Sequence, residues 1–75
     1  MPIIDVRAIE KVFTSEQKQQ IIQKLTDAMV SVTGEKTRGV TWVTISEVKG
    51  GDWGIGGKPI TSDDVKAMAE GKHAA

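Results

Sequence analysis

The feature that most restricts the fold of this chain is one long helical pattern between two short β-rich segments. Residues 14–33 carry apolar side chains at spacings of three and four, as an amphipathic helix does. Residues 2–9 and 40–48 are rich in β-branched residues with alternating character, which predicts strands. A crossover of this length permits parallel pairing and should be right-handed. The sequence therefore predicts a β-α-β unit with parallel strands, in the α/β (α+β) class.

The helical segment carries its own start and stop signals. Thr14 is the expected N-cap, and Gln17 stands at the N3 position that completes a capping box. Gly34 follows the last periodic residue and is the expected C′ residue. The apolar stripe expected to pack on the strands consists of Ile21, Ile22, Leu25, Ala28, Met29 and Val32.

Each predicted strand places alternate side chains on opposite faces. In the first strand, the apolar face expected to meet the core holds Pro2, Ile4, Val6 and Ala8. Its other face carries charges but also Ile3 and Ile9, which indicates a subunit contact. In the second strand, one face holds Thr41, Val43 and Ile45, and the other holds Val40, Trp42, Thr44 and Ser46.

The C-terminal third is glycine-rich and then helical. The segment 49–59 has five glycines within eight residues and predicts a tight hairpin that projects Trp53. A short helix should follow over 60–69, with Ser62 as its N-cap. Residues 35–39 should form a turn-rich connector and residues 70–75 a frayed tail. We expect one domain over residues 1–75.

Composition narrows the class of protein. A chain of 75 residues buries only about 60% of its unfolded surface, and without cysteine it has no disulfide to support the fold. We therefore expect a homo-oligomer. Ten basic and ten acidic residues give a formal net charge of zero, so no nucleic-acid surface is indicated. No apolar run is long enough for a membrane span and no signal peptide is apparent, which favours a cytoplasmic protein.

Several common site motifs are not met. The run Gly54-Ile55-Gly56-Gly57-Lys58-Pro59 has proline where a dinucleotide fingerprint needs its third glycine, and it does not meet the phosphate-loop pattern either. Without cysteine and with one histidine, His73, the sequence offers no metal cluster and no serine or cysteine triad.

Pro2 is the residue with the most distinctive chemistry. Removal of Met1 would leave a free secondary amine, a group that no internal proline can supply. An α-amino group has an ordinary pKa of about 7.7–8.0, and an apolar surround lowers it. Such an amine can act as a general base and then as a general acid. The alternative interpretation is that Pro2 only rigidifies the entry to the first strand.

Three features together resemble the 4-oxalocrotonate tautomerase family. They are Pro2 opening a strand, the helix start Glu16-Gln17-Lys18, and Gly54-Ile55-Gly56-Gly57 directly after an aromatic residue. The resemblance covers roughly residues 2 to 60. It implies a tautomerase-like β-α-β subunit with a C-terminal hairpin, assembled as a hexamer that is a trimer of dimers. It also implies an enzyme without metal or organic cofactor, in the setting of aromatic compound degradation.

The resemblance further implies a role for two residues. In the family, the amino-terminal proline takes a proton from an enol hydroxyl or an activated carbon and returns it to another carbon, so Pro2 would be the catalytic residue. Typical substrates are 2-hydroxydienoates. The family's aromatic residue before the glycine run helps to form the apolar pocket around the proline, and Trp53 matches that position.

Two positions depart from the family pattern. Well-studied members carry an arginine before the helix and another on the second strand, and both grip oxygens of a dianionic substrate. Here the first position falls on Phe13, or on Val12 under a different placement of a one-residue insertion, and the second falls on Trp42. Neither is cationic, and an indole cannot replace a bidentate guanidinium. Turnover of a dicarboxylate is therefore in doubt, as are the family's dehalogenase and decarboxylase chemistries.

Other residues are candidates for substrate binding. Arg38, just before the second strand, is the first choice for holding an anion, and its alternative role is a solvated loop charge. Arg7 and Lys11 are weaker candidates, for a subunit contact and a loop charge respectively. Trp42 is either part of the pocket or a core or interface aromatic.

Taken together, the sequence predicts a cofactor-independent isomerase acting on a small carboxylate with a conjugated enol, such as a monoanionic enolpyruvate. Pro2 is the predicted catalytic residue, with Trp53, Trp42 and Arg38 as substrate-binding residues. The alternative is a non-catalytic structural or partner-binding subunit of the same fold in a homo- or hetero-oligomer. Retention of Met1 would exclude the amine chemistry.

Overall fold

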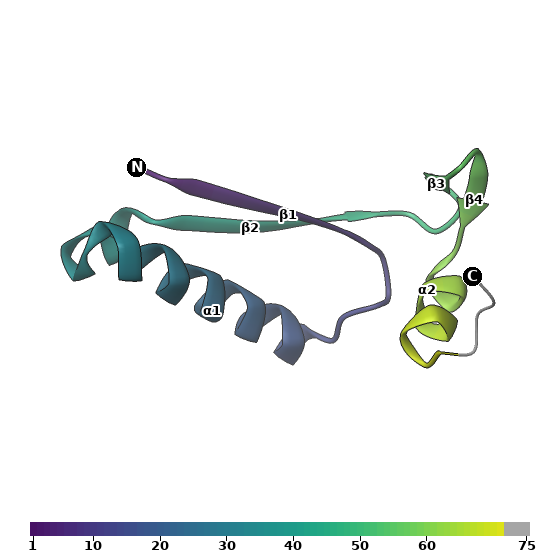
Figure 1. Cartoon of the computed structure of the whole chain (residues 1–75), viewed down its shortest axis with the longest axis horizontal. Helices are drawn as coiled ribbons and strands as arrows, with labels where there is room; N and C mark the ends of the chain where they lie inside the picture. Colours follow the sequence, from purple (N-terminus) through teal and green to yellow (C-terminus); the bar gives the residue numbers. More distant parts are fainter. Residues whose placement is uncertain (72–75) are drawn as a thin grey trace. The chain divides into compact units, whose positions relative to one another are not determined.

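A computed structural model describes residues 1–71 of the chain (Figure 1). The elements follow the order β1 (Ile3–Ile9), α1 (Ser15–Thr33), η1 (Glu35–Val40, a 3₁₀-helix), β2 (Trp42–Val48), β3 (Trp53–Ile55), β4 (Lys58–Ile60) and α2 (Ser62–Ala69). They form two compact units. The first unit comprises Met1–Val6 with Phe13–Ser46, and the second comprises Arg7–Val12 with the chain from Glu47 onward. The prediction of one domain over residues 1–75 stays a prediction.

Strands β1 and β2 pair with each other in a two-stranded parallel sheet, which confirms the predicted β-α-β unit. The pairing is visible in the backbone bonds that flank it. The Trp42 N–H donates to the Pro2 carbonyl oxygen at 3.0 Å in the first unit, and the Glu10 N–H donates to the Val48 carbonyl oxygen at 2.8 Å in the second. Helix α1 runs alongside the strand segments of the first unit (Figure 1).

Burial alternates along β1 as a strand with one covered face requires. The predicted core face of Pro2, Ile4, Val6 and Ala8 is half-buried throughout. On the opposite face Ile3 is 61% exposed, as expected for a contact surface. The same expectation is wrong for Ile9, which is only 4% exposed. Ile9 is the last residue of the strand and belongs to the second unit, so the alternation of the first unit does not extend to it.

Helix α1 begins at the predicted capping box. The Gln17 N–H donates to Thr14 Oγ1 at 3.1 Å, and the Thr14 N–H donates to Gln17 Oε1 at 2.9 Å. These reciprocal bonds satisfy backbone donors that the first turn leaves without intrahelical partners.

The predicted apolar stripe of α1 needs correction, since two of its members, Ile22 and Ala28, are exposed. Leu25 and Met29 are half-buried as expected, but the buried residue of the helix is Val30, which the predicted stripe omits. Val30 lies one turn after Thr26 and next to Met29, so it belongs to the covered side. Val32 is 83% exposed, because it follows Val30 by two residues and its side chain therefore points about 200° around the helix axis from that of Val30.

The connector after α1 is more regular than predicted. Gly34 ends the helix with a φ of 103°, and its N–H donates to the Val30 carbonyl oxygen at 2.8 Å. The chain then forms the 3₁₀-helix η1 over Glu35–Val40 instead of an irregular turn. As a consequence, β2 begins at Trp42 and not at Val40.

Strands β3 and β4 form the predicted hairpin. Ile55 lies opposite Lys58, which leaves Gly56 and Gly57 as a two-residue loop with φ values of 58° and 86°. Positive φ at both positions is the signature of a type I′ turn, which glycine adopts without strain. Trp53 lies opposite Ile60 at the open end of the hairpin and is half-buried.

The N-cap of helix α2 lies one residue earlier than predicted. The N-cap is Thr61 and not Ser62, because Asp64 stands three residues after Thr61 and completes a second capping box. Asp64 Oδ2 accepts the Thr61 N–H at 2.9 Å, and Thr61 Oγ1 accepts the Asp64 N–H at 3.3 Å. Most of the predicted tail, including His73, lies outside the described residues. Within 1–71, the search for a helix of membrane-spanning length and hydropathy finds none.

Candidate functional site

The entry to β1 holds Pro2, the residue with the most distinctive predicted chemistry. Pro2 is half-buried, and its carbonyl oxygen accepts the first backbone bond from β2, donated by the Trp42 N–H at 3.0 Å. The structure therefore brings two of the four predicted site residues together at the start of the paired strands. The Trp42 side chain lies on the exposed face of β2 and is 53% exposed.

A polar cluster fixes the relative position of the two strands next to this pair. Asp5 Oδ1 accepts bonds from Thr44 Oγ1 at 2.8 Å and Ser46 Oγ at 3.3 Å. Asp5 follows Ile3 by two residues, and Thr44 follows Trp42 by two, so these bonds and the Pro2–Trp42 bond describe the same register. Ile3 and Trp42 thus form an exposed apolar pair at this end of the sheet, on the face opposite the Pro2 side chain.

Arg38 lies in η1, four residues before Trp42, and its guanidinium binds two carboxylates. Arg38 Nε donates to Glu35 Oε1 at 2.7 Å and Nη2 donates to Glu35 Oε2 at 3.3 Å. Arg38 Nη1 donates to Asp27 Oδ1 at 2.7 Å. The hydrogen bond from Arg38 holds the pKa of Glu35 below its usual value, and the bonds to Glu35 and Asp27 raise the pKa of Arg38. An incoming substrate anion would therefore meet the negative charge of both carboxylates.

Trp53 belongs to the second unit, where the hairpin is fastened by backbone bonds and one carboxylate. Trp53 is half-buried at the start of β3. Glu10 Oε2 accepts the Gly50 N–H at 2.7 Å, and the Gly51 N–H donates to the Ile60 carbonyl oxygen at 3.0 Å. The sequence analysis gave no role to Glu10, because a bond across 40 positions leaves no local signal.

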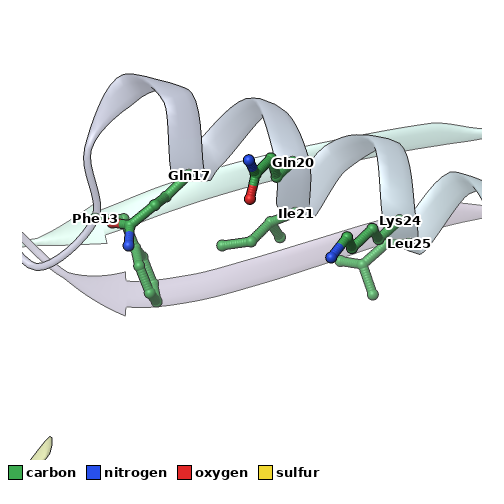
Figure 2. Close-up of a pocket in the computed structure, with 6 residues that line it drawn as sticks. All are labelled: Phe13, Gln17, Gln20, Ile21, Lys24 and Leu25. Carbon is green, nitrogen blue, oxygen red and sulfur yellow. The ribbon is translucent and has the colours of Figure 1, made fainter.

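An open pocket of about 320 Å³ lies along the first half of α1 (Figure 2). It is lined by Phe13, Gln17, Gln20, Ile21, Lys24 and Leu25. The pocket joins an aromatic ring and aliphatic side chains to one ammonium group, a combination that suits an apolar ligand with a single negative charge. Lys24 is exposed on the helix surface, and the grouping of its ammonium group with Phe13 was not predicted from the sequence.

The two positions at which the family pattern has arginines lie far apart in a single chain. Phe13 stands immediately before α1, whereas Trp42 follows both α1 and η1 and pairs with Pro2. The helix of 19 residues is about 28 Å long. Within the first unit, the N-terminus of the chain and the start of α1 therefore lie towards opposite ends of the helix (Figure 1).

No metal centre is indicated by the acidic residues of the described chain. Among residues 1–71, the structure groups no three histidine, cysteine, aspartate or glutamate side chains around a common point.

Comparison with known proteins gives the same picture of the fold. The family model described as tautomerase enzyme matches residues 2–63. Probable tautomerase K2 of Dickeya dadantii (strain 3937) is 39% identical over 61 residues, which is 81% of this chain and 90% of that protein. The crystal structure of DmpI from Helicobacter pylori is 35% identical with a TM-score of 0.66, over 77% of this chain and 94% of that one.

A second solved structure brings the comparison to 4-oxalocrotonate tautomerases. Apo unfused 4-OT is 34% identical with a TM-score of 0.71, over 79% of this chain and 93% of that chain. The family match starts at Pro2 and runs through the glycine-rich hairpin, so it contains every predicted site residue. The chain thus belongs to the tautomerase family, in its 4-oxalocrotonate tautomerase branch, and membership supports an isomerase function.

Proposed function

We propose that this protein interconverts enol and keto forms of a small carboxylate, with Pro2 as general base and then general acid. The observation that carries the proposal is the position of Pro2. It is the first residue of the family match and stands at the entry of β1, bonded to the start of β2. Once Met1 is removed, its nitrogen is a secondary amine that can accept a proton from an enol hydroxyl and return it to carbon.

The apolar residues around this end of the sheet support the same chemistry. Trp42 bonds to the Pro2 carbonyl oxygen through its backbone N–H, and we propose that Trp53 and Trp42 supply an apolar wall. An apolar surround favours the neutral amine, which is the form that acts as a base. The exclusion of water also strengthens the polar contacts that hold the substrate.

The proposed substrate carries one negative charge. Phe13 and Trp42 stand at the two positions where the family resemblance has arginines, and Arg38 is engaged by Asp27 and Glu35. A bidentate grip on two carboxylates therefore lacks its usual donors. A monoanionic enolpyruvate with an apolar substituent fits the indole and phenyl rings better than a dianion does.

The proposal includes an oligomeric enzyme, with a trimer of dimers as the arrangement that the family resemblance implies. Among the described residues, only Ile9, Val30 and Ile60 are buried apolar residues, while eight large apolar side chains are exposed. A chain with so small a core gains stability from association. Phe13 and Pro2 lie towards opposite ends of α1, so a substrate that contacts both would need two chains.

The test is an assay of enol ketonisation with protein whose intact mass confirms the loss of Met1. A monoanionic arylenolpyruvate is compared with dianionic 2-hydroxymuconate. We expect the monoanion to turn over faster, and Pro2→Ala, which leaves a primary amine, to lower kcat/KM by about 100-fold or more. A Pro2→Ala variant that retains full activity would contradict the proline mechanism.

The second candidate function is a non-catalytic subunit of the same fold. It is favoured by the absence of a cation at both Phe13 and Trp42 and by the carboxylates that occupy Arg38. This function predicts Met1 retention or no Pro2-dependent turnover of either substrate. It also predicts recovery of activity when the chain is mixed with a related subunit that carries the arginines.

A further inference from the structure

The segment that joins α1 to β2 determines where β2 begins. Helix η1 ends at Val40, and Trp42 opens β2 two residues later. The Thr41 N–H donates to the Arg38 carbonyl oxygen at 3.3 Å, and Thr41 Oγ1 donates to the Thr37 carbonyl oxygen at 2.9 Å. The next N–H along the chain, that of Trp42, makes the bond to Pro2. A displacement of η1 would therefore displace the Trp42 N–H directly.

Two sets of contacts hold η1 against the end of α1. The first is local, since Thr37 Oγ1 donates to the Gly34 carbonyl oxygen at 2.6 Å and shares a bond with Thr33 Oγ1 at 2.6 Å. The second is the pairing of Arg38 with Asp27, which lies on α1 six residues before Thr33. The Arg38–Asp27 contact thus ties the far part of η1 back to the body of the helix.

The geometry of the Arg38 network is better than that of an ordinary surface ion pair. Nε and Nη2 of Arg38 bind both oxygens of Glu35, while Nη1 binds Asp27. A single exposed pair contributes little to stability, but bidentate arginine geometry and a shared network are the recognised exceptions. The network fixes the guanidinium plane, and with it the position of the Arg38 backbone.

This arrangement disfavours a direct role for Arg38 in substrate binding. Each of its three guanidinium nitrogens already donates to a carboxylate, at 2.7, 2.7 and 3.3 Å. These bonds use three of the five guanidinium N–H groups, and a substrate carboxylate at the remaining two would lie beside the negative charges of Glu35 and Asp27. The contacts of Arg38 with α1 and η1 indicate a structural connection to the site instead.

We infer that Arg38 is a positioning residue, which holds η1 on α1 through Asp27 and Glu35 and so places Trp42 against Pro2. The inference rests on the proposed function only in treating Pro2 and Trp42 as parts of the site. The position of the Trp42 N–H can be measured without any substrate.

The test compares Arg38→Gln, Glu35→Gln and Asp27→Asn in the full chain. Lys36→Gln is the matched control, because it removes a cation from the same segment but outside the network. The first readout is amide hydrogen exchange at Trp42, with the Glu10 amide of the second unit as an internal reference for global unfolding. The second readout is kcat and KM for the monoanionic enolpyruvate.

A positioning role predicts the same direction of change for all three network variants. We expect exchange at Trp42 to rise by about 5-fold in Arg38→Gln, Glu35→Gln and Asp27→Asn, with exchange at Glu10 unchanged. The loss of activity should appear mainly in kcat. Arg38→Gln combined with Glu35→Gln should be no worse than Arg38→Gln alone, because both substitutions disrupt the same network. Lys36→Gln should match the parent protein, and Arg38→Lys should recover only part of the effect.

A substrate-binding role predicts opposite directions instead. Glu35→Gln and Asp27→Asn would free Arg38 and lower KM, whereas Arg38→Gln would raise it. That pattern, or unchanged exchange at Trp42 in Arg38→Gln, would overturn the inference. If no variant and no parent protein turns over substrate, the proposed function fails, and the exchange rates at Trp42 still decide whether Arg38 positions this residue.

Discussion

At the scale of single residues, the chemistry of the first unit depends on contacts between side chains that are distant in sequence. Arg38 meets Asp27 across 11 positions, and Thr44 meets Asp5 across 39. A sequence shows which residues can donate or accept, and it pointed to Pro2, Trp42, Trp53 and Arg38. It could not show that Arg38 binds Asp27 and Glu35, because that depends on the path of η1 over the end of α1.

The same network gives stability a defined pH dependence. The pKa of Glu35 in the folded chain lies below its ordinary value of 4.5, because Arg38 binds the ionised carboxylate. The contribution of ionised Glu35 to the free energy of unfolding is therefore complete above about pH 4.5, and it is lost as the pH falls through the lowered pKa. We expect urea unfolding to show the parent more stable than Glu35→Gln at neutral pH, with the gap closing on acidification. A gap that widens in acid would contradict this sign.

At the scale of elements, capping signals and periodicity predicted most of the fold. The capping box of α1, the parallel strands and the β3–β4 hairpin all follow from local patterns. Helix η1 was missed because a single 3₁₀ stretch has no amphipathic period and its composition is that of a turn. The N-cap of α2 was predicted one residue too late, because Thr61 and Ser62 both carry a hydroxyl suited to an N-cap. The reciprocal bonds between Thr61 and Asp64 favour Thr61.

The capping box of α1 allows a test with a neighbouring control. Thr14→Ala removes the hydroxyl that accepts the Gln17 N–H and should lower the free energy of unfolding by about 1 kcal/mol. Ser15→Ala changes the next residue, which is the first of α1, and should leave the unfolding free energy nearly unchanged. Denaturant titrations of the two variants check this, and equal losses would show that the cap is not the source of the effect.

At the scale of the whole molecule, the number of exposed apolar side chains exceeds what the fold of one chain accounts for. Ile3 at 61% and Trp42 at 53% exposure stand beside each other at the start of the strands, and Ile55 at 52% stands in the hairpin. The sequence predicted association from chain length and the lack of cysteine. It could not say which faces stay uncovered, as the burial of Ile9 shows.

Association predicts a melting temperature that depends on protein concentration. We expect Tm to rise over a roughly 100-fold increase in concentration, because a bound partner stabilises only the folded chain. Ile3→Lys should lower Tm and shift the sedimentation profile towards smaller species. Gln23→Lys, an exposed polar position on α1, serves as the control and should change neither. A concentration-independent Tm would argue for a monomer.

Within residues 1–71, the sheet formed by β1 and β2 has two strands, so neither of them is an interior strand there. Each strand has one ladder of backbone groups satisfied by its neighbour and presents a second ladder at an open edge. Such edges are templates for further strand addition, whether by the correct partner or by a misfolded chain. In newly made subunits, assembly with the correct partner therefore competes with aggregation. The expression level, and the rate of synthesis relative to the rate at which subunits meet, should affect the yield of active protein as strongly as the stability of the fold does.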